Sequence, residues 1–82
     1  MRRKFKGKSR KAYLKCLYLV PYKTGKLRNQ GLKYNEIGQN SLIYVDLDIT
    51  PYGAYINRPG YRTHGWFNKF CDRYERELRK LK

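Results

Sequence analysis

The chain has 82 residues and carries a net charge of +14, from twenty Lys and Arg against six Asp and Glu. A chain this short forms one domain with a small core. It has neither the roughly 20 consecutive apolar residues that span a bilayer nor the apolar region of a signal peptide. These properties exclude a membrane-spanning protein and predict synthesis in the cytoplasm. They leave a partner subunit as the expected source of further stability.

The positive charge is concentrated at the start of the chain. Residues 1–35 hold twelve basic groups and no acidic one, so an anionic partner is expected near this segment. Nucleic acid is the first candidate for that partner, an acidic subunit the second and an anionic membrane surface the third. The alternative is a solvated basic surface without a partner. Nine tyrosines add aromatic rings, which suit protein interfaces and nucleic-acid surfaces alike.

In chain order, residues 1–10 are predicted to form a flexible basic arm and residues 11–82 a single α+β domain. Ser9 is suited to cap a helix that begins at Arg10. Pro21 should end this helix, because proline disfavours helical geometry in the residue before it.

A short helical turn is predicted next, capped by Thr24 and ended by Gly31. The hydrophobic period then changes to two. Residues 31–37 and 41–49 are predicted as a pair of strands joined by the turn-forming sequence Gly38-Gln39-Asn40. In the second strand alternate residues are apolar and share one face. These residues are Ile43, Val45, Leu47 and Ile49.

The last part of the chain is predicted to hold a third short strand and a long helix. The strand covers residues 52–57, and the helix runs from Gly65 to about Leu81 after a cap at Thr63. The fold is thus α+β, with an N-terminal helix, a short helical turn, a small antiparallel sheet of about two to four strands and a C-terminal amphipathic helix. The apolar stripe of that last helix is Phe67, Phe70, Cys71, Tyr74, Leu78 and Leu81.

The sequence predicts no catalytic, metal or cofactor site. Cys16 and Cys71 fall in apolar helical patterns, which indicates two buried thiols; a disulfide between the two helices is the alternative. His64 is the only histidine, so a zinc site has too few ligands. Asp46 and Asp48 share one predicted strand face, where a solvated or salt-bridged role is more typical than acid–base chemistry. The chain is therefore predicted not to be an enzyme.

The basic residues near the start are candidates for contact with DNA or an acidic partner. Phe5 and Tyr13 are interleaved with them, so the segment is suited to follow a phosphate backbone and to stack on exposed bases. This pattern supports an alternative function, a small protein that binds DNA or RNA without sequence preference. Association with the ribosome is one form of this alternative. The candidate contacts are Arg2, Arg3, Lys4, Lys6, Lys8, Arg10 and Lys11.

Three short segments occur in an order that resembles a known family. The first is P-x-x-T-G-x-L-R at residues 21–28, the second PYGAYIN at 51–57, and the third Gly-Trp-Phe at the start of the last helix. This pattern resembles the neck, or tail-completion, proteins of long-tailed bacteriophages, also called minor capsid proteins. The residues that carry the resemblance, all in structural roles, are Pro21, Thr24, Gly25, Leu27, Arg28, Pro51, Tyr52, Tyr55, Gly65, Trp66 and Phe67.

The resemblance implies a structural protein of the virion at the head–tail junction. It implies a homo-oligomeric ring of about six or twelve subunits that joins the DNA-filled head to the tail. The partners would be neighbouring connector and tail proteins, with packaged DNA close by and no membrane. The segment Asn57-Arg58-Pro59-Gly60 departs from the family pattern, and the net charge is higher than is usual there.

Overall fold

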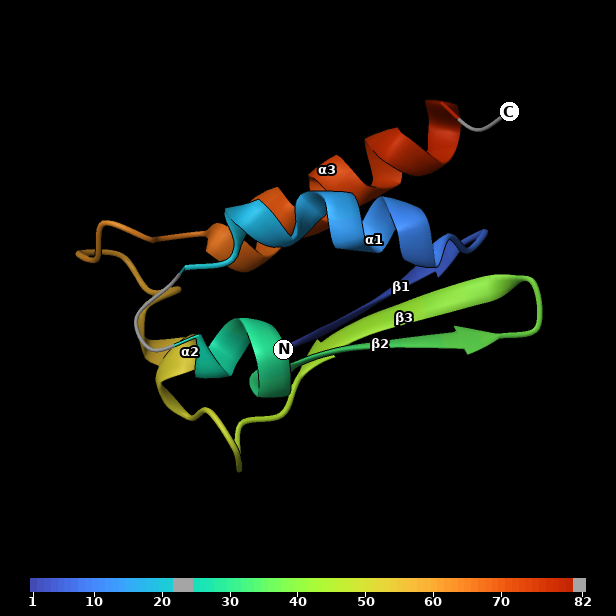
Figure 1. Ribbon diagram of the computed structural model, residues 1–82. Coiled ribbons are helices and arrows are strands. Elements are labelled where there is room, and N and C mark those ends of the chain that lie inside the picture. Colours follow the sequence, from blue (N-terminus) through green and yellow to red (C-terminus); the bar gives the residue numbers. More distant parts are fainter. Residues whose placement is uncertain (22–24, 81–82) are drawn as a thin grey trace.

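The computed structural model describes residues 1–21 and 25–80, so the predicted cap Thr24 and the last stripe residue Leu81 lie outside the described residues. Two helices lie on one face of a three-stranded antiparallel sheet (Figure 1), and the predicted α+β class is confirmed. The elements are β1 (Arg2–Lys6), α1 (Arg10–Cys16), a 3₁₀ turn η1 (Leu17–Leu19), a π-helical turn η2 (Leu27–Gly31), β2 (Leu32–Ile37), β3 (Asn40–Val45), α2 (Tyr52–Tyr55) and α3 (Trp66–Lys80).

The first strand is where the structure differs most from the sequence prediction. Arg2–Lys6 form an edge strand that pairs with β3, so the predicted flexible arm is wrong for these residues. Phe5 explains the difference, because its ring is buried and packs edge-on against Tyr74 at 4.8 Å. One apolar residue among four cations gives little hydrophobic pattern, and the partner strand lies far away in the sequence.

The hairpin of β2 and β3 confirms the predicted strand pair. Gly38 has a φ of +60° in its turn, a value that favours glycine. The sheet order is β1-β3-β2, which places β3 in the centre. Ser9 accepts a hydrogen bond from the amide of Ala12, so the predicted cap of α1 is also confirmed.

β3 ends at Val45, four residues earlier than predicted. The carboxylate of Asp46 accepts hydrogen bonds from the amides of Asp48 and Ile49, at 3.0 and 3.4 Å, and turns the chain away from the sheet. Leu47 is consequently exposed. The predicted sharing of one strand face by Asp46 and Asp48 is therefore wrong.

The predicted third strand at residues 52–57 is wrong as well. The segment Tyr52–Tyr55 forms the short helix α2, which starts from Pro51 with a φ of −62°. Proline is suited to the start of a helix because it has no amide hydrogen to leave unpaired. Gly53, which is small, lets this helix approach the core closely.

The long helix α3 confirms the predicted amphipathic helix, but its cap differs. The amide of Phe67 donates to the side chain of Asn57, while the hydroxyl of Thr63 donates to the carbonyl of Ile56. Thr63 is thus not the cap, because the loop before α3 folds back and brings Asn57 to the helix start. Along the rest of α3 the buried stripe includes Phe70, Cys71 and Tyr74.

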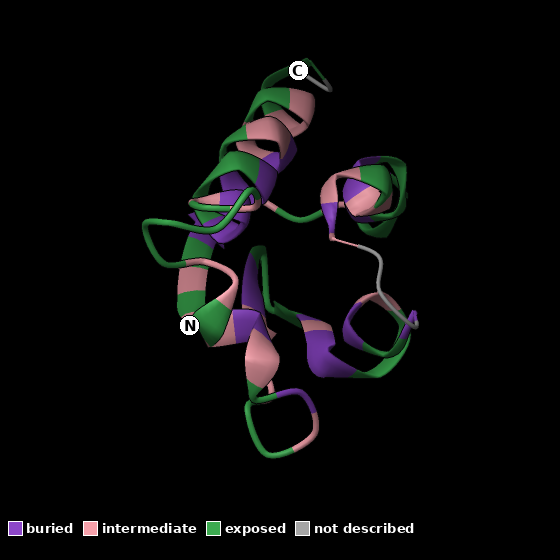
Figure 2. Ribbon diagram, turned by 90° about the vertical axis from the view of Figure 1, so that its left-hand side faces the viewer, coloured by how far each residue is buried: buried purple, intermediate pink, exposed green. Residues whose placement is uncertain are grey.

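The core lies between the helices and the sheet. Figure 2 shows the buried residues gathered where these layers meet and the exposed residues on the outer helix faces and loops. The rings of Tyr13 and Tyr34 stack with their centres 4.8 Å apart. The hydroxyl of Tyr74 forms hydrogen bonds with the hydroxyls of Tyr34 and Ser41, at 3.4 and 2.8 Å. Because these hydroxyls bond to one another, the centre of the small core has satisfied polar groups.

Candidate interaction surfaces

The three segments that carry the family resemblance meet at one place in the structure. The amide of Leu27 donates to the hydroxyl of Tyr52 at 3.1 Å, and the indole nitrogen of Trp66 donates to the carbonyl of Gly53 at 3.0 Å. A Cβ on Gly53 would lie 3.2 Å from the side chain of Leu27 and 3.3 Å from that of Val45. Leu27, Tyr52, Gly53 and Trp66, which come from the three segments, therefore pack together, and we call these four residues the motif core.

Of the other motif residues that the structure describes, Arg28 and Phe67 contact neighbouring segments. Arg28 donates from its guanidinium to the carbonyl of Val20 at 3.2 Å, and this bond ties η2 to the segment that ends at Pro21. Phe67 packs edge-on against Trp66 at 5.7 Å. Gly25 and Gly65 adopt positive φ angles of +83° and +75°.

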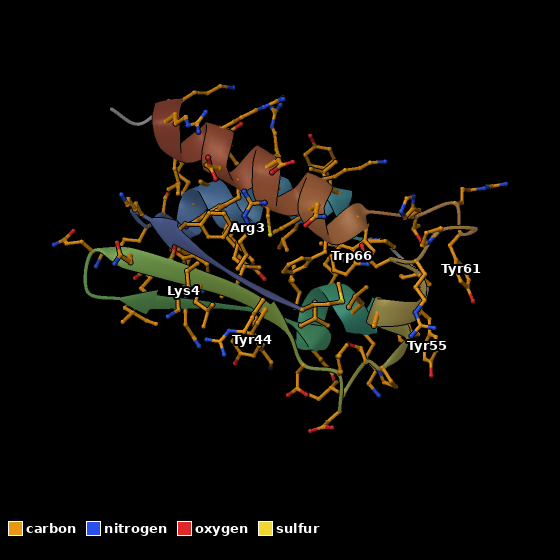
Figure 3. The ribbon with its side chains drawn as sticks, turned by 180° about the vertical axis from the view of Figure 1, so that it is seen from behind. Arg3, Lys4, Tyr44, Tyr55, Tyr61 and Trp66 are labelled. Carbon is orange, nitrogen blue, oxygen red and sulfur yellow. The ribbon has the colours of Figure 1, made fainter. Side chains whose placement is uncertain are left out.

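Tyr55 behaves differently from the rest of the motif. Its side chain is 52% exposed and lies under the guanidinium of Arg58, 4.9 Å from the ring centre. Figure 3 shows Tyr55 and Tyr61 at the end of the molecule formed by α2 and the loop that follows it. The exposed side of Tyr55 can therefore contact a partner, whereas the hydroxyl of Tyr52 is bonded to the amide of Leu27.

The seven basic candidate residues do not form one surface. Arg3 points to the helix side and forms ion pairs with Asp72 at 2.9 Å and Glu75 at 3.2 Å. Hydrogen bonding to Asp72 raises the pKa of Arg3 above its ordinary value. Arg10 lies over the ring of Tyr34, 5.2 Å from its centre. The remaining candidates are exposed, which are Arg2, Lys4, Lys6, Lys8 and Lys11.

The face of the sheet turned away from the helices brings four cations together. In the strand register Arg2 pairs with Tyr44 and Tyr44 with Lys33, so these three side chains share one face. Figure 3 shows Arg3 on the helix side of the sheet and Tyr44 on the other side. We call this face the open sheet face; its residues are Arg2, Lys4, Lys6, Lys33, Asn35, Ile37, Asn40, Leu42 and Tyr44.

No acidic residue lies on the open sheet face. Glu36 belongs to the opposite face, where its carboxylate accepts a hydrogen bond from the hydroxyl of Tyr34 at 2.9 Å. Asp46 and Asp48 lie beyond the end of β3 and bound the face at that end. Lys33 and Tyr44 were not among the residues that the sequence analysis selected. The alternation of side chains along each strand indicates which residues share a face. Only the strand register shows which residues of neighbouring strands lie beside one another.

A separate exposed apolar pair lies on the outer side of the first helical segment. Leu14 in α1 is 55% exposed, and Tyr18 in the 3₁₀ turn η1 is 64% exposed. Single exposed apolar residues are normal, but two that are close in sequence offer apolar area to a partner.

The two cysteines are buried, whereas the histidine is exposed. Cys16 and Cys71 are buried free thiols, as predicted, and no disulfide joins them. Burial raises the pKa of the Cys71 thiol to about 12, so it stays protonated at neutral pH. His64 is exposed in the loop before α3. Within residues 1–21 and 25–80, no three His, Cys, Asp or Glu side chains are placed to hold a metal ion.

Comparison with protein-family models, with curated proteins and with solved structures finds no match to this chain. Over the part of the chain that the structure describes, no helix is long and apolar enough to cross a membrane.

Proposed function

We propose that this protein is a structural subunit of the head–tail junction of a tailed bacteriophage, where it belongs to the ring that completes the neck. The observation that supports the proposal is the motif core. The residues of three separate motif segments bond directly to one another, through Leu27 and Tyr52 and through Gly53 and Trp66. Contact between the segments supports the interpretation of the three motifs as one pattern.

The exposed side chains that remain fit a subunit whose surface is completed by neighbours. The pair Leu14 and Tyr18 and the two tyrosines Tyr55 and Tyr61 offer apolar and aromatic area at two separate places. A small subunit in a closed ring gains stability from contacts on two sides. In this role the protein binds copies of itself and the adjoining connector and tail proteins, and it performs no catalysis.

Deleting the gene from the phage genome that encodes it tests the proposal. We expect filled heads and separate tails that do not join, seen by electron microscopy, and normal particles when the protein is supplied from a plasmid. Mass spectrometry of purified virions should detect the protein, and labelled antibody should place it at the junction. Normal yields of infectious particles without the gene, or absence of the protein from virions, would overturn the proposal.

The alternative is a nucleic-acid-binding protein that acts outside a virion. Light scattering of the purified protein without DNA shows whether it forms rings, and the deletion separates the two functions. A head–tail subunit forms DNA-independent rings or stays a monomer until it meets its partners. A cellular binding protein would leave particle assembly unchanged when deleted.

A further inference from the structure

We infer that the open sheet face is a docking surface for the phosphate backbone of duplex DNA. Four cations lie on it, Arg2, Lys4, Lys6 and Lys33, and no acidic side chain shares the face. In contrast, Arg3, the cation between two of them in sequence, is already neutralised by Asp72 and Glu75 on the helix side.

The spacing of the cations suits an extended polyanion. Arg2, Lys4 and Lys6 follow one another along β1 at intervals of about 6.6 Å, so they form a row about 13 Å long. Lys33 lies across the sheet from Arg2 at about two strand spacings, or about 9.5 Å. Tyr44 and Leu42 lie between the cations of the two edge strands. Mutual repulsion of these charges is relieved when an anion with several charges binds.

The composition of the face favours nucleic acid over an acidic protein or a membrane. Lysine is depleted at protein–protein interfaces, whereas protein–DNA interfaces are strongly positive. Insertion into a membrane surface needs a broad apolar area. Here Ile37 is the exposed apolar residue of the face, and Leu42 is buried among its neighbours.

The same composition favours a duplex over a single strand. Proteins that bind single strands stack successive bases on several aromatic rings. The open sheet face has one such ring, Tyr44, between the cationic strands. Contact with the backbone therefore provides the binding, without reading of the sequence. The inference does not depend on the head–tail proposal, because purified protein and free DNA are sufficient to test it.

The test is a salt titration of the full chain with a labelled duplex of about 25 base pairs, measured by fluorescence anisotropy. One variant replaces the four cations of the face, as Arg2→Gln, Lys4→Gln, Lys6→Gln and Lys33→Gln. We expect the slope of log affinity against log salt to fall by about 3–4, and affinity at 0.1 M salt to fall on the order of tenfold or more.

The matched control removes four exposed cations that lie outside the sheet, as Lys15→Gln, Arg62→Gln, Lys69→Gln and Arg76→Gln. It changes the net charge by the same amount, and we expect less than one third of the effect of the first variant. Circular dichroism checks that both variants fold. Should the first variant unfold, amide chemical shifts of the unaltered protein with the duplex must move in β1, β2 and β3 rather than in α3.

Three results would overturn the inference. The first is an equal loss of affinity in both variants, which would mean attraction to net charge alone. The second is a clear preference of the unaltered protein for single-stranded DNA. The third is equally tight binding of an acidic polypeptide such as polyglutamate. Loss of duplex binding in the face variant with normal particle assembly would separate this inference from the head–tail proposal.

Discussion

Tyr52 and Tyr55 lie on the same short helix, yet their hydroxyls have different surroundings. The hydroxyl of Tyr52 accepts the amide hydrogen of the buried residue Leu27, while Tyr55 is half exposed. Both belong to the segment that carries the family resemblance. At the scale of single residues, the structure thus separates a tyrosine that holds the fold from one that faces solvent.

This difference leads to a prediction for two substitutions of the same kind. Tyr52→Phe leaves the amide of Leu27 buried without an acceptor, so we expect the free energy of unfolding to fall by about 1–3 kcal/mol. Tyr55→Phe keeps its ring under Arg58 and should change stability by less than about 0.5 kcal/mol. Urea denaturation of both variants measures the two values. Equal effects would contradict the description of the motif core.

The residues that cap helices α1 and α3 show how far the role of a single residue can be predicted from the sequence. Ser9 lies next to its helix in sequence, so its role followed from local chemistry and is confirmed. Thr63 also precedes a helix, but it bonds to Ile56, and Asn57 supplies the cap from across the loop. The second case depends on how a loop folds back, which no local pattern encodes.

At the scale of elements, the predictions are correct where neighbouring residues determine the structure and wrong where residues far apart in the sequence determine it. The hairpin and the long helix α3 have strong periodic patterns and a local turn, and both were predicted. The strand β1 was missed because its pairing with β3 is distant, and residues 52–57 were assigned to a strand because their aromatic content is typical of one. Of the candidate cations, the sequence supplied the residues but not the face that each would occupy.

The role of β1 can be measured directly. Phe5→Ala empties a buried site beside Tyr74, so we expect a loss of about 3–5 kcal/mol, enough to unfold much of a small domain. Lys4→Ala, on the open sheet face, should cost less than about 0.5 kcal/mol. Thermal and urea unfolding compare the two. A negligible effect of Phe5→Ala would mean that residues 2–6 are the flexible arm after all.

At the scale of the whole molecule, the net charge of +14 opposes folding, because most cations have few acidic neighbours. Added salt screens this repulsion, and the Debye length falls from about 30 Å at 0.01 M to about 10 Å at 0.1 M. We therefore expect the unfolding temperature to rise over this range. The rise should be smaller in the variant without the four cations of the open sheet face. A fall in the unfolding temperature would mean that the ion pairs of α3, which salt weakens, outweigh the repulsion.

The pairing of the first strand with β3 also bears on how the protein is made. Residues 2–6 leave the ribosome before β3, because the strand that they pair with follows about forty residues later. The hairpin of β2 and β3 can close on its own, whereas β1 must wait for that hairpin before it gains a partner. The cations of β1 therefore stay unpaired until β3 has been made, and they become an ordered edge only when the rest of the sheet is complete.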